Sequence, residues 1–180
     1  MSPAPLLAHS QLARAVRGGW YALAVRLLGI DYGRRRIGLA LSDASGMLAR
    51  PWRTVEAAST PQASAAALST LLETLRTEED AEAGDVRAAI VGLPLRLSGE
   101  EHEQSQAARR FADELGRLSG LQVYLQDERL SSVEAEQRLA VRERDWRVRK
   151  RKLDAAAAAV ILQDFIDAHP RTVPQGDQPG

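Results

Sequence analysis

The sequence contains no cysteine, which excludes disulfide bonds, thiolate zinc sites and cysteine nucleophiles. Its three histidines, His9, His102 and His169, lie far apart and do not form the ligand pair of a zinc metalloprotease. Neither of the two lysines, Lys150 and Lys152, follows a glycine, so the lysine-containing phosphate loop of P-loop NTPases is excluded as well. These absences leave carboxylates as the most economical catalytic groups.

Net charge and long apolar runs are lacking too. The 180 residues carry 24 basic and 24 acidic side chains, so any nucleic-acid binding must come from local clusters of charge. No stretch offers the eighteen or so uninterrupted apolar residues of a membrane span, and arginines interrupt the apolar residues 6–30. We therefore expect a soluble, cytoplasmic protein, and its hydrophobic share of 44% predicts a packed core.

Composition divides the chain into three parts. Residues 1–25 read as a flexible N-terminal extension broken by prolines and glycines, in which Val25 is a candidate translation start that intact-mass measurement would test. Residues 26–168 carry the regular hydrophobic patterns of one domain. Residues 169–180 are rich in proline, glycine and glutamine, which predicts a disordered tail.

Patterns of apolar residues predict five strands and four helices within the domain. The predicted strands are 26–31, 37–42, 47–55, 86–92 and 121–126. The predicted helices are 60–76, 100–118, 131–141 and 153–168. The first three strands form an antiparallel meander, in which Pro51 places the third at an edge. Strands and helices then alternate, so we expect an α/β fold with a mixed five-stranded sheet flanked by helices.

Acidic residues fall at comparable places in this plan. Asp31 closes the first strand, Asp127 and Glu128 close the last strand, and Asp154 lies in the first turn of the predicted last helix. The first and last strands can come close in such a sheet, where ligands gather at the carboxyl ends of strands. The small residues Ala155–Ala159 would let the helix approach the sheet and aim Asp154 at the same point.

Converging carboxylates repel one another unless a cation lies between them. Hard oxygen ligands select Mg²⁺ or Mn²⁺, and two such ions about 4 Å apart can activate water for phosphodiester cleavage. Each acid also has a structural explanation. Asp31 could belong to a plain turn, Asp154 could stabilise a helix N-terminus, and Asp127 and Glu128 could pair with Arg129. Taken singly, each acid is better explained by a structural role than by a catalytic one. The hypothesis of a metal site therefore depends on the acids as a group.

Two basic segments flank the proposed acidic site. One is the turn Arg34, Arg35 and Arg36. The other is expected to be a flexible loop before Asp154, with the basic residues Arg142, Arg144, Arg147, Arg149, Lys150, Arg151 and Lys152. Both suit a phosphate backbone, and Arg96 in the loop after the fourth strand could add a contact. Trp146 could stack on an unpaired base or pack against the core.

Several segments together closely resemble the bacterial YqgF family, also called RuvX. They are LLGIDYGRRRIGLALSD, GMLARPWRTVE, AAIVGLPLRLSGEEHEQSQAARRFADEL, QDERLSSVEAEQRL and KLDAAAAAVILQDFI. They extend over residues 26–168 in the family's order. Each motif alone is common, whereas their joint occurrence is specific. The departures are the N-terminal extension and the three arginines after Gly33, which put substrate contacts in doubt but leave the metal site intact.

The resemblance implies an RNase H-like fold related to RuvC resolvases, and a divalent-metal nuclease. It implies maturation of the 5′ end of precursor 16S ribosomal RNA, with Holliday junction resolution as the older alternative. By motif, Asp31, Glu128 and Asp154 correspond to the catalytic and metal-binding acids, and Asp127 is an alternative for the second. Neighbouring strand residues face opposite sides of a sheet, so Asp127 and Glu128 should not both point toward the site. We prefer Glu128 as the second acid.

The expected partner is structured RNA, within a ribosome precursor, with branched DNA as the alternative. The chain would act as a monomer or a homodimer, and cutting both strands of a junction would require the dimer. Two other classes compete with the nuclease. A sugar kinase or actin-like ATPase needs two such domains around a cleft, which one domain cannot form. A catalytically inactive nucleic-acid-binding module would not need all three acids.

Overall fold

The computed structural model describes residues 26–77, 86–128 and 146–169, with the side chains of 146–151 left out. The predicted N-terminal extension (1–25), the predicted helix 131–141 and nearly all of the predicted tail, residues 170–180, lie outside the described residues.

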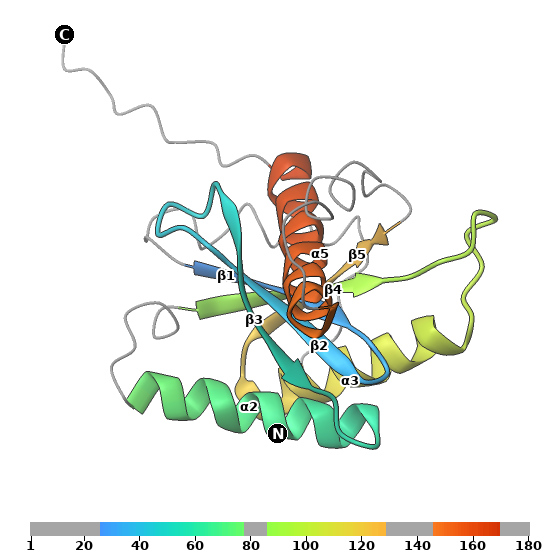
Figure 1. The fold of residues 1–180 in the computed structure, drawn as a ribbon, viewed down its shortest axis with the longest axis horizontal. Coiled ribbons are helices and arrows are strands. Elements are labelled where there is room, and N and C mark those ends of the chain that lie inside the picture. The colour runs from blue at the N-terminus through green and yellow to red at the C-terminus, as the bar shows by residue number, and fades with distance from the viewer. Residues whose placement is uncertain (1–25, 78–85, 129–145, 170–180) are drawn as a thin grey trace, which may run out of the picture.

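A five-stranded mixed sheet forms the centre of the domain (Figure 1). The strands are β1 (Arg26–Tyr32), β2 (Arg36–Ser42), β3 (Ala49–Glu56), β4 (Val86–Leu93) and β5 (Gln122–Asp127). Their order across the sheet is β3-β2-β1-β4-β5. The first three strands pair antiparallel, and β4 and β5 run parallel to β1. The expected meander and mixed sheet are confirmed.

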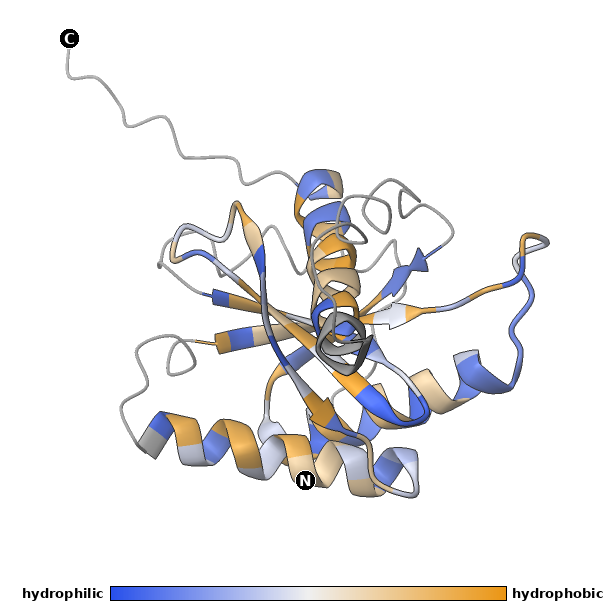
Figure 2. Cartoon of the chain, in the orientation of Figure 1, coloured by the Kyte–Doolittle hydropathy of each residue, from blue (hydrophilic) through white to orange (hydrophobic). Residues whose placement is uncertain are grey.

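Helices cover both faces of the sheet. On one face lie α2 (Pro61–Thr77) and α3 (Glu103–Ser119), and on the other lies α5 (Trp146–Ala168). Hydrophobic residues lie along the middle of the sheet, whereas much of the edge strand β3 is hydrophilic (Figure 2). Among the helices of the described residues, none is long and apolar enough to cross a membrane.

Local signals in the sequence explain where α2 and α3 begin. The Thr60 hydroxyl accepts the Ala63 N–H at 3.1 Å, and Pro61 takes the first helical position, where its missing N–H costs nothing. Helix α3 begins at Glu103 rather than at the predicted residue 100, because the His102 ring caps it, accepting the N–H groups of Gln104 and Ser105. The left-handed Gly120, with φ 69°, ends this helix.

The prediction for the last helix was wrong at its start. Helix α5 begins at Trp146, not at residue 153, so much of the expected flexible basic loop is helical. Arginine and lysine are good helix formers, and residues 146–168 contain neither proline nor glycine. Asp154 consequently lies beyond the second turn. Since the helix dipole acts only within the first turn, the alternative role of Asp154 as a stabiliser of the helix N-terminus is excluded.

Candidate active site

Asp31 lies between two glycines in the sheet. The register pairs it with Gly38 of β2, and the parallel register with β4 places Gly92 on its other side. Gly92 is in turn paired with Gln126 of β5. Since side chains alternate along a strand, this row across four strands faces α5, as do Gly29 and Leu27 of β1. The two strands that flank Asp31 therefore place no side chain directly beside it.

Helix α5 uses the space left by Gly38 to reach the sheet. A Cβ atom on Gly38 would overlap the backbone carbonyl of Asp154. One turn further along, a Cβ on Gly29 would lie 2.6 Å from the Ala158 carbonyl oxygen and 2.7 Å from the Leu162 Cβ. The two glycines thus let the helix backbone rest directly on β1 and β2, which brings Asp154 beside Asp31.

Glu128 uses the space on the other side. We expected the first and last strands to come close, but β4 lies between β1 and β5. The carboxylate of Glu128 crosses β4 because residue 92 has no side chain, and a Cβ there would overlap the Glu128 Oε1 atom. Ile161 of α5 closes this space, with its Cδ1 2.7 Å from the same position. The glycine row thus brings acids from β1, α5 and the end of β5 to one place.

Burial and neighbouring negative charges raise the pKa values of Asp31 and Glu128. Burial, and then the charge of Asp154, raises the pKa of Asp31 to about 6. Burial, and then the charges of Asp31 and Asp127, raises the pKa of Glu128 to about 7. Such shifts are typical of carboxylates that share a site, and perturbed groups of this kind gather at functional sites.

Arg36 supplies positive charge at this place. Its Nε donates to the Oδ2 of Asp154 at 2.5 Å, and the two side chains are 25% and 24% exposed. The strand alternation that directs Gly38 toward α5 directs Arg36 to the same side of β2. The sequence predicts Arg36 as a contact to nucleic acid, and the structure pairs it with one of the three acids.

The donor set suits a hard divalent ion. Asp31, Glu128 and Asp154 offer only carboxylate oxygens, the ligands of Mg²⁺ and Mn²⁺, and their mutual repulsion is relieved by a cation. Within the parts of the chain that the structure describes, no three acidic, histidine or cysteine side chains are placed to hold a metal ion as they stand. The residues fit the ion chemically, and Asp154 accepts a hydrogen bond from Arg36 at the same place.

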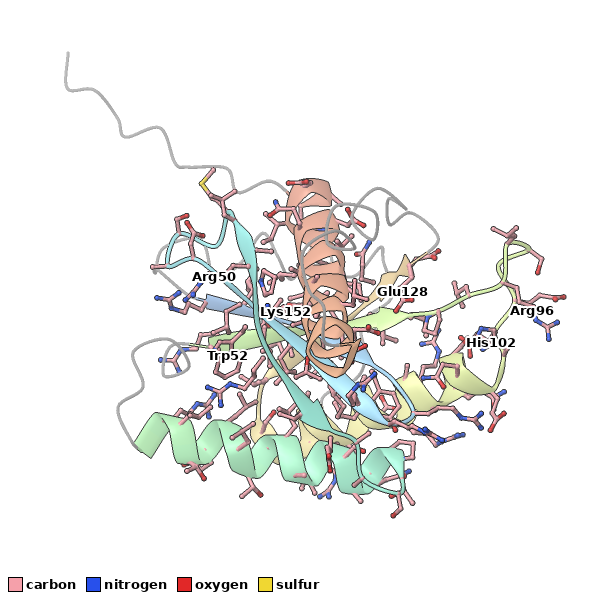
Figure 3. All side chains as sticks on the ribbon, viewed as in Figure 1. Arg50, Trp52, Arg96, His102, Glu128 and Lys152 are labelled. Carbon is pink, nitrogen blue, oxygen red and sulfur yellow. The ribbon has the colours of Figure 1, made fainter. Side chains whose placement is uncertain are left out.

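The other predicted nucleic-acid contacts that the structure describes are Arg34, Arg35, Arg96 and Lys152. Arg34 is exposed and pairs with Glu103 at 3.1 Å, and Arg35 is exposed. Arg96 pairs with Glu100 at 3.7 Å and projects from the loop after β4, well away from Glu128 (Figure 3). Lys152 is exposed on α5.

The remaining predicted contacts lie outside what the structure describes. Arg142 and Arg144 fall in residues 129–145, and the side chains of Trp146, Arg147, Arg149, Lys150 and Arg151 are not described.

Sequence reasoning missed the residues that make the site possible. Gly29, Gly38 and Gly92 were not singled out, although a glycine inside a strand signals the close approach of another backbone. Gln126 was missed as well. It is only 4% exposed and lies beside Gly92 in the row. A buried amide in the row that contains Asp31 has no signal in the sequence until the register of β4 and β5 is known.

The fold and the site together define a class of protein. A sheet of order β3-β2-β1-β4-β5 with helices on both faces, and acids from the first strand, the last strand and the final helix, is an RNase H-like domain. The model of the family described as "RuvX: Holliday junction resolvase" matches residues 25–168. The chain belongs to this family, which confirms the resemblance found in the sequence.

Relatives with assigned names cover the same part of the chain. A protein of Anaeromyxobacter sp. (strain Fw109-5), named "Putative pre-16S rRNA nuclease", is 44% identical over 143 residues, which is 79% of this chain and 97% of the relative. A protein of the same name from Roseiflexus sp. (strain RS-1) is 37% identical and spans 79% and 94%. Among solved structures, Thermus thermophilus RuvC matches with a TM-score of 0.46 at 13% identity, covering 82% of this chain and 98% of RuvC.

Proposed function

We propose that this protein is a divalent-metal-dependent nuclease that hydrolyses phosphodiester bonds in structured RNA, at the 5′ end of precursor 16S ribosomal RNA. The observation that carries the proposal is the convergence of Asp31, Glu128 and Asp154 through the spaces left by Gly38 and Gly92. The names of the relatives support the substrate. Membership of the family supports the nuclease class.

Asp31, Glu128 and Asp154 are the residues that would hold Mg²⁺ or Mn²⁺, with Asp127 at the edge of the site. When bound, such ions supply an activated water and stabilise the leaving oxygen of a phosphodiester. The protein's own part is to fix the carboxylates on rigid elements and to limit the access of water by burial. Glu128, with a pKa of about 7, exchanges a proton near neutral pH, which limits the negative charge of the cluster while it is empty.

The basic side chains around the acids suit the phosphate backbone of the substrate. Arg34, Arg35 and Lys152 are exposed, and Arg96 projects from the loop after β4 (Figure 3). Contacts of this kind position a nucleic acid and carry no sequence information. We propose that they orient structured RNA across the acidic cluster, together with the basic residues of segment 142–151.

Branched DNA is the second candidate substrate, because the family is described as a Holliday junction resolvase. The same carboxylates would serve the same chemistry on DNA. Cutting two strands of a junction requires two active sites, hence two copies of the chain. The two substrates therefore differ in the oligomeric state that they demand, as well as in the sugar.

The test compares the wild-type protein with Asp31→Asn on two labelled substrates, a structured ribosomal RNA precursor and a four-way DNA junction. Each is incubated with Mg²⁺, Mn²⁺ or EDTA. We expect RNA cleavage that needs the metal and falls about 100-fold or more in the variant, as disturbed metal sites commonly do. The control is Asp113→Asn on the surface of α3, which should cleave like the wild type.

Three results would change the proposal. Cleavage of the junction alone would favour the resolvase. Equal cleavage by Asp31→Asn would remove the acidic cluster from the mechanism. Tight RNA binding without cleavage in any metal would support an inactive binding module.

A further inference from the structure

Arg36 forms an ion pair with a member of the acidic cluster, with its Nε atom 2.5 Å from the Oδ2 of Asp154. Both side chains are about three-quarters shielded from water. The attraction between the two charges is screened less by water in such a place than at the surface. By comparison, the Arg34–Glu103 pair of the same turn is 76% and 81% exposed.

Both backbones that carry this pair are held in place. The Gly33 N–H donates to the Arg36 carbonyl at 3.0 Å, and the Ala57 N–H donates to the Arg35 carbonyl at 3.0 Å, so the turn and β3 fix the start of β2. On the other side, the Asp154 backbone rests on Gly38. The ion pair can therefore open by rotation of the two side chains, without movement of either backbone.

Asp154 also faces a negative neighbour. Its charge contributes to the raised pKa of Asp31, so the two carboxylates lie close enough to interact while Arg36 neutralises one of them. The guanidinium thus compensates negative charge in the cluster, as a bound metal ion would. Because Nε donates to one oxygen of Asp154, the guanidinium and a metal ion would compete for the negative charge of the same carboxylate.

We infer that Arg36 is a displaceable counter-ion of Asp154, a positioning residue that weakens the binding of divalent ions to the acidic cluster. The inference rests on the proposed function in taking Asp31, Glu128 and Asp154 as metal ligands. Arg36 stabilises the empty site by compensating Asp154. It opposes the loaded site by competing for the negative charge of Asp154 and by placing a positive charge beside the ion.

The opposite role predicts the opposite result. If Arg36 instead held Asp154 in the orientation that a metal ion needs, removing the guanidinium would weaken the binding of the ion. A purely structural ion pair would leave the metal affinity unchanged. The sign of the change therefore separates the three roles.

The experiment measures Mn²⁺ binding to the full chain by titration calorimetry, with wild type, Arg36→Gln and the control Arg34→Gln. Arg34 lies in the same turn and carries the same charge, but it pairs with Glu103 outside the cluster. We expect Arg36→Gln to bind Mn²⁺ about tenfold more tightly, the size expected for a double and a single charge several ångströms apart in a water-like medium. Arg34→Gln should change the affinity by less than about twofold.

A second variant covers the case in which Arg36→Gln does not fold. Arg36→Lys keeps the charge but loses the Nε donor, and it should bind Mn²⁺ about threefold more tightly because its contact with Asp154 is weaker. Unchanged or weaker binding in the folded Arg36 variants overturns the inference. If the wild type still cleaves RNA with Mn²⁺, the proposed function survives that result. If neither wild type nor variant binds Mn²⁺, the inference falls together with the metal requirement.

Discussion

The two faces of the sheet are built from different side chains. Under α2 and α3, the sheet presents large apolar residues such as Leu28, Ile30 and Leu39, and Tyr32 stacks on Phe111 with ring centroids 4.5 Å apart. Under α5, the sheet presents several glycines and alanines, and its larger apolar side chains, such as Leu27 and Ile90, are interspersed among them. One face therefore stabilises the domain by burying large apolar side chains. The other face lets the backbone of α5 approach the sheet closely.

The difference teaches how a small domain places polar groups near its core. On a face filled with leucine and isoleucine, the side chains keep the backbones of the helices away from the backbone of the sheet. A face of glycines lets the backbone of Asp154 and the carboxylate of Glu128 lie directly on the sheet, next to Asp31. The price is electrostatic, because buried acids carry raised pKa values. The face that carries the proposed function thus contributes less to stability than the face behind it.

The largest loss of stability should come from the α2 and α3 face. Phe111 is fully buried against Tyr32, so Phe111→Ala should lower the free energy of unfolding by about 3–5 kcal/mol. Denaturant titration measures the loss. The fraction that remains folded should still cleave RNA at the wild-type rate. A loss of activity in the folded fraction would show that this face also shapes the site.

On the α5 face, a single methyl group should cost activity more than stability. Gly92→Ala places a Cβ where the Glu128 carboxylate and the Ile161 side chain now lie. Overpacking of this kind costs about 1–3 kcal/mol, and we expect RNA cleavage to fall about 100-fold because Glu128 is displaced. Unfolding curves and cleavage rates of the same preparation test this. Wild-type cleavage by Gly92→Ala would show that the position of Glu128 is not critical.

The raised pKa values predict that the metal-free protein loses stability as the pH rises. The folded state binds protons at Asp31 up to about pH 6, whereas the unfolded chain releases them near 3.8. Stability therefore falls between those values. In EDTA, Asp31→Asn should be more stable than the wild type by about 2 kcal/mol at pH 8, and by almost nothing at pH 4.

Urea titrations of both proteins at several pH values measure this difference. Saturating Mn²⁺ should reduce it at pH 8, since an ion that binds only the folded wild type stabilises it. A variant that is less stable than the wild type at pH 8 in EDTA would contradict the electrostatic cost assigned to this face.

The smallest effect expected is local to α2. Thr60→Ala removes the hydroxyl that accepts the Ala63 N–H, which should lower the free energy of unfolding by about 1 kcal/mol. Cleavage should not change, because this helix lies on the opposite face from the acids. Thr60→Ser keeps the hydroxyl and is the matched control. An equal loss in both variants would mean that the capping bond is not the cause.

The sequence allowed most of the fold to be predicted, and part of the site. Strand periods, the Thr60-Pro61 start of α2 and the edge position of β3 are local signals, and the structure confirms them. The start of α5 was missed because a run of basic residues suits both a loop and a helix. The roles of Asp31, Glu128 and Asp154 in catalysis stay predictions.

The geometry between the acids could not be predicted, since it depends on register. Gly38 and Gly92 flank Asp31 only because β1 pairs with β2 and β4 in one particular alignment. The pairing of Arg36 with Asp154 spans 118 positions of sequence. No local pattern encodes contacts of that range. The strand ends and the family resemblance pointed to the acids but not to their partners.

The edge strand β3 has a consequence for how copies of this protein can associate. Pro51 has no N–H to offer, and the pairing of β2 with β3 shifts register beside it. Exposed Arg50 and Arg53 add charge to the same strand. Among the described residues β3 is the outermost strand on its side of the sheet, and an edge of this composition is a poor template for another strand. We therefore expect a junction-cutting pair of chains to associate through a surface other than β3.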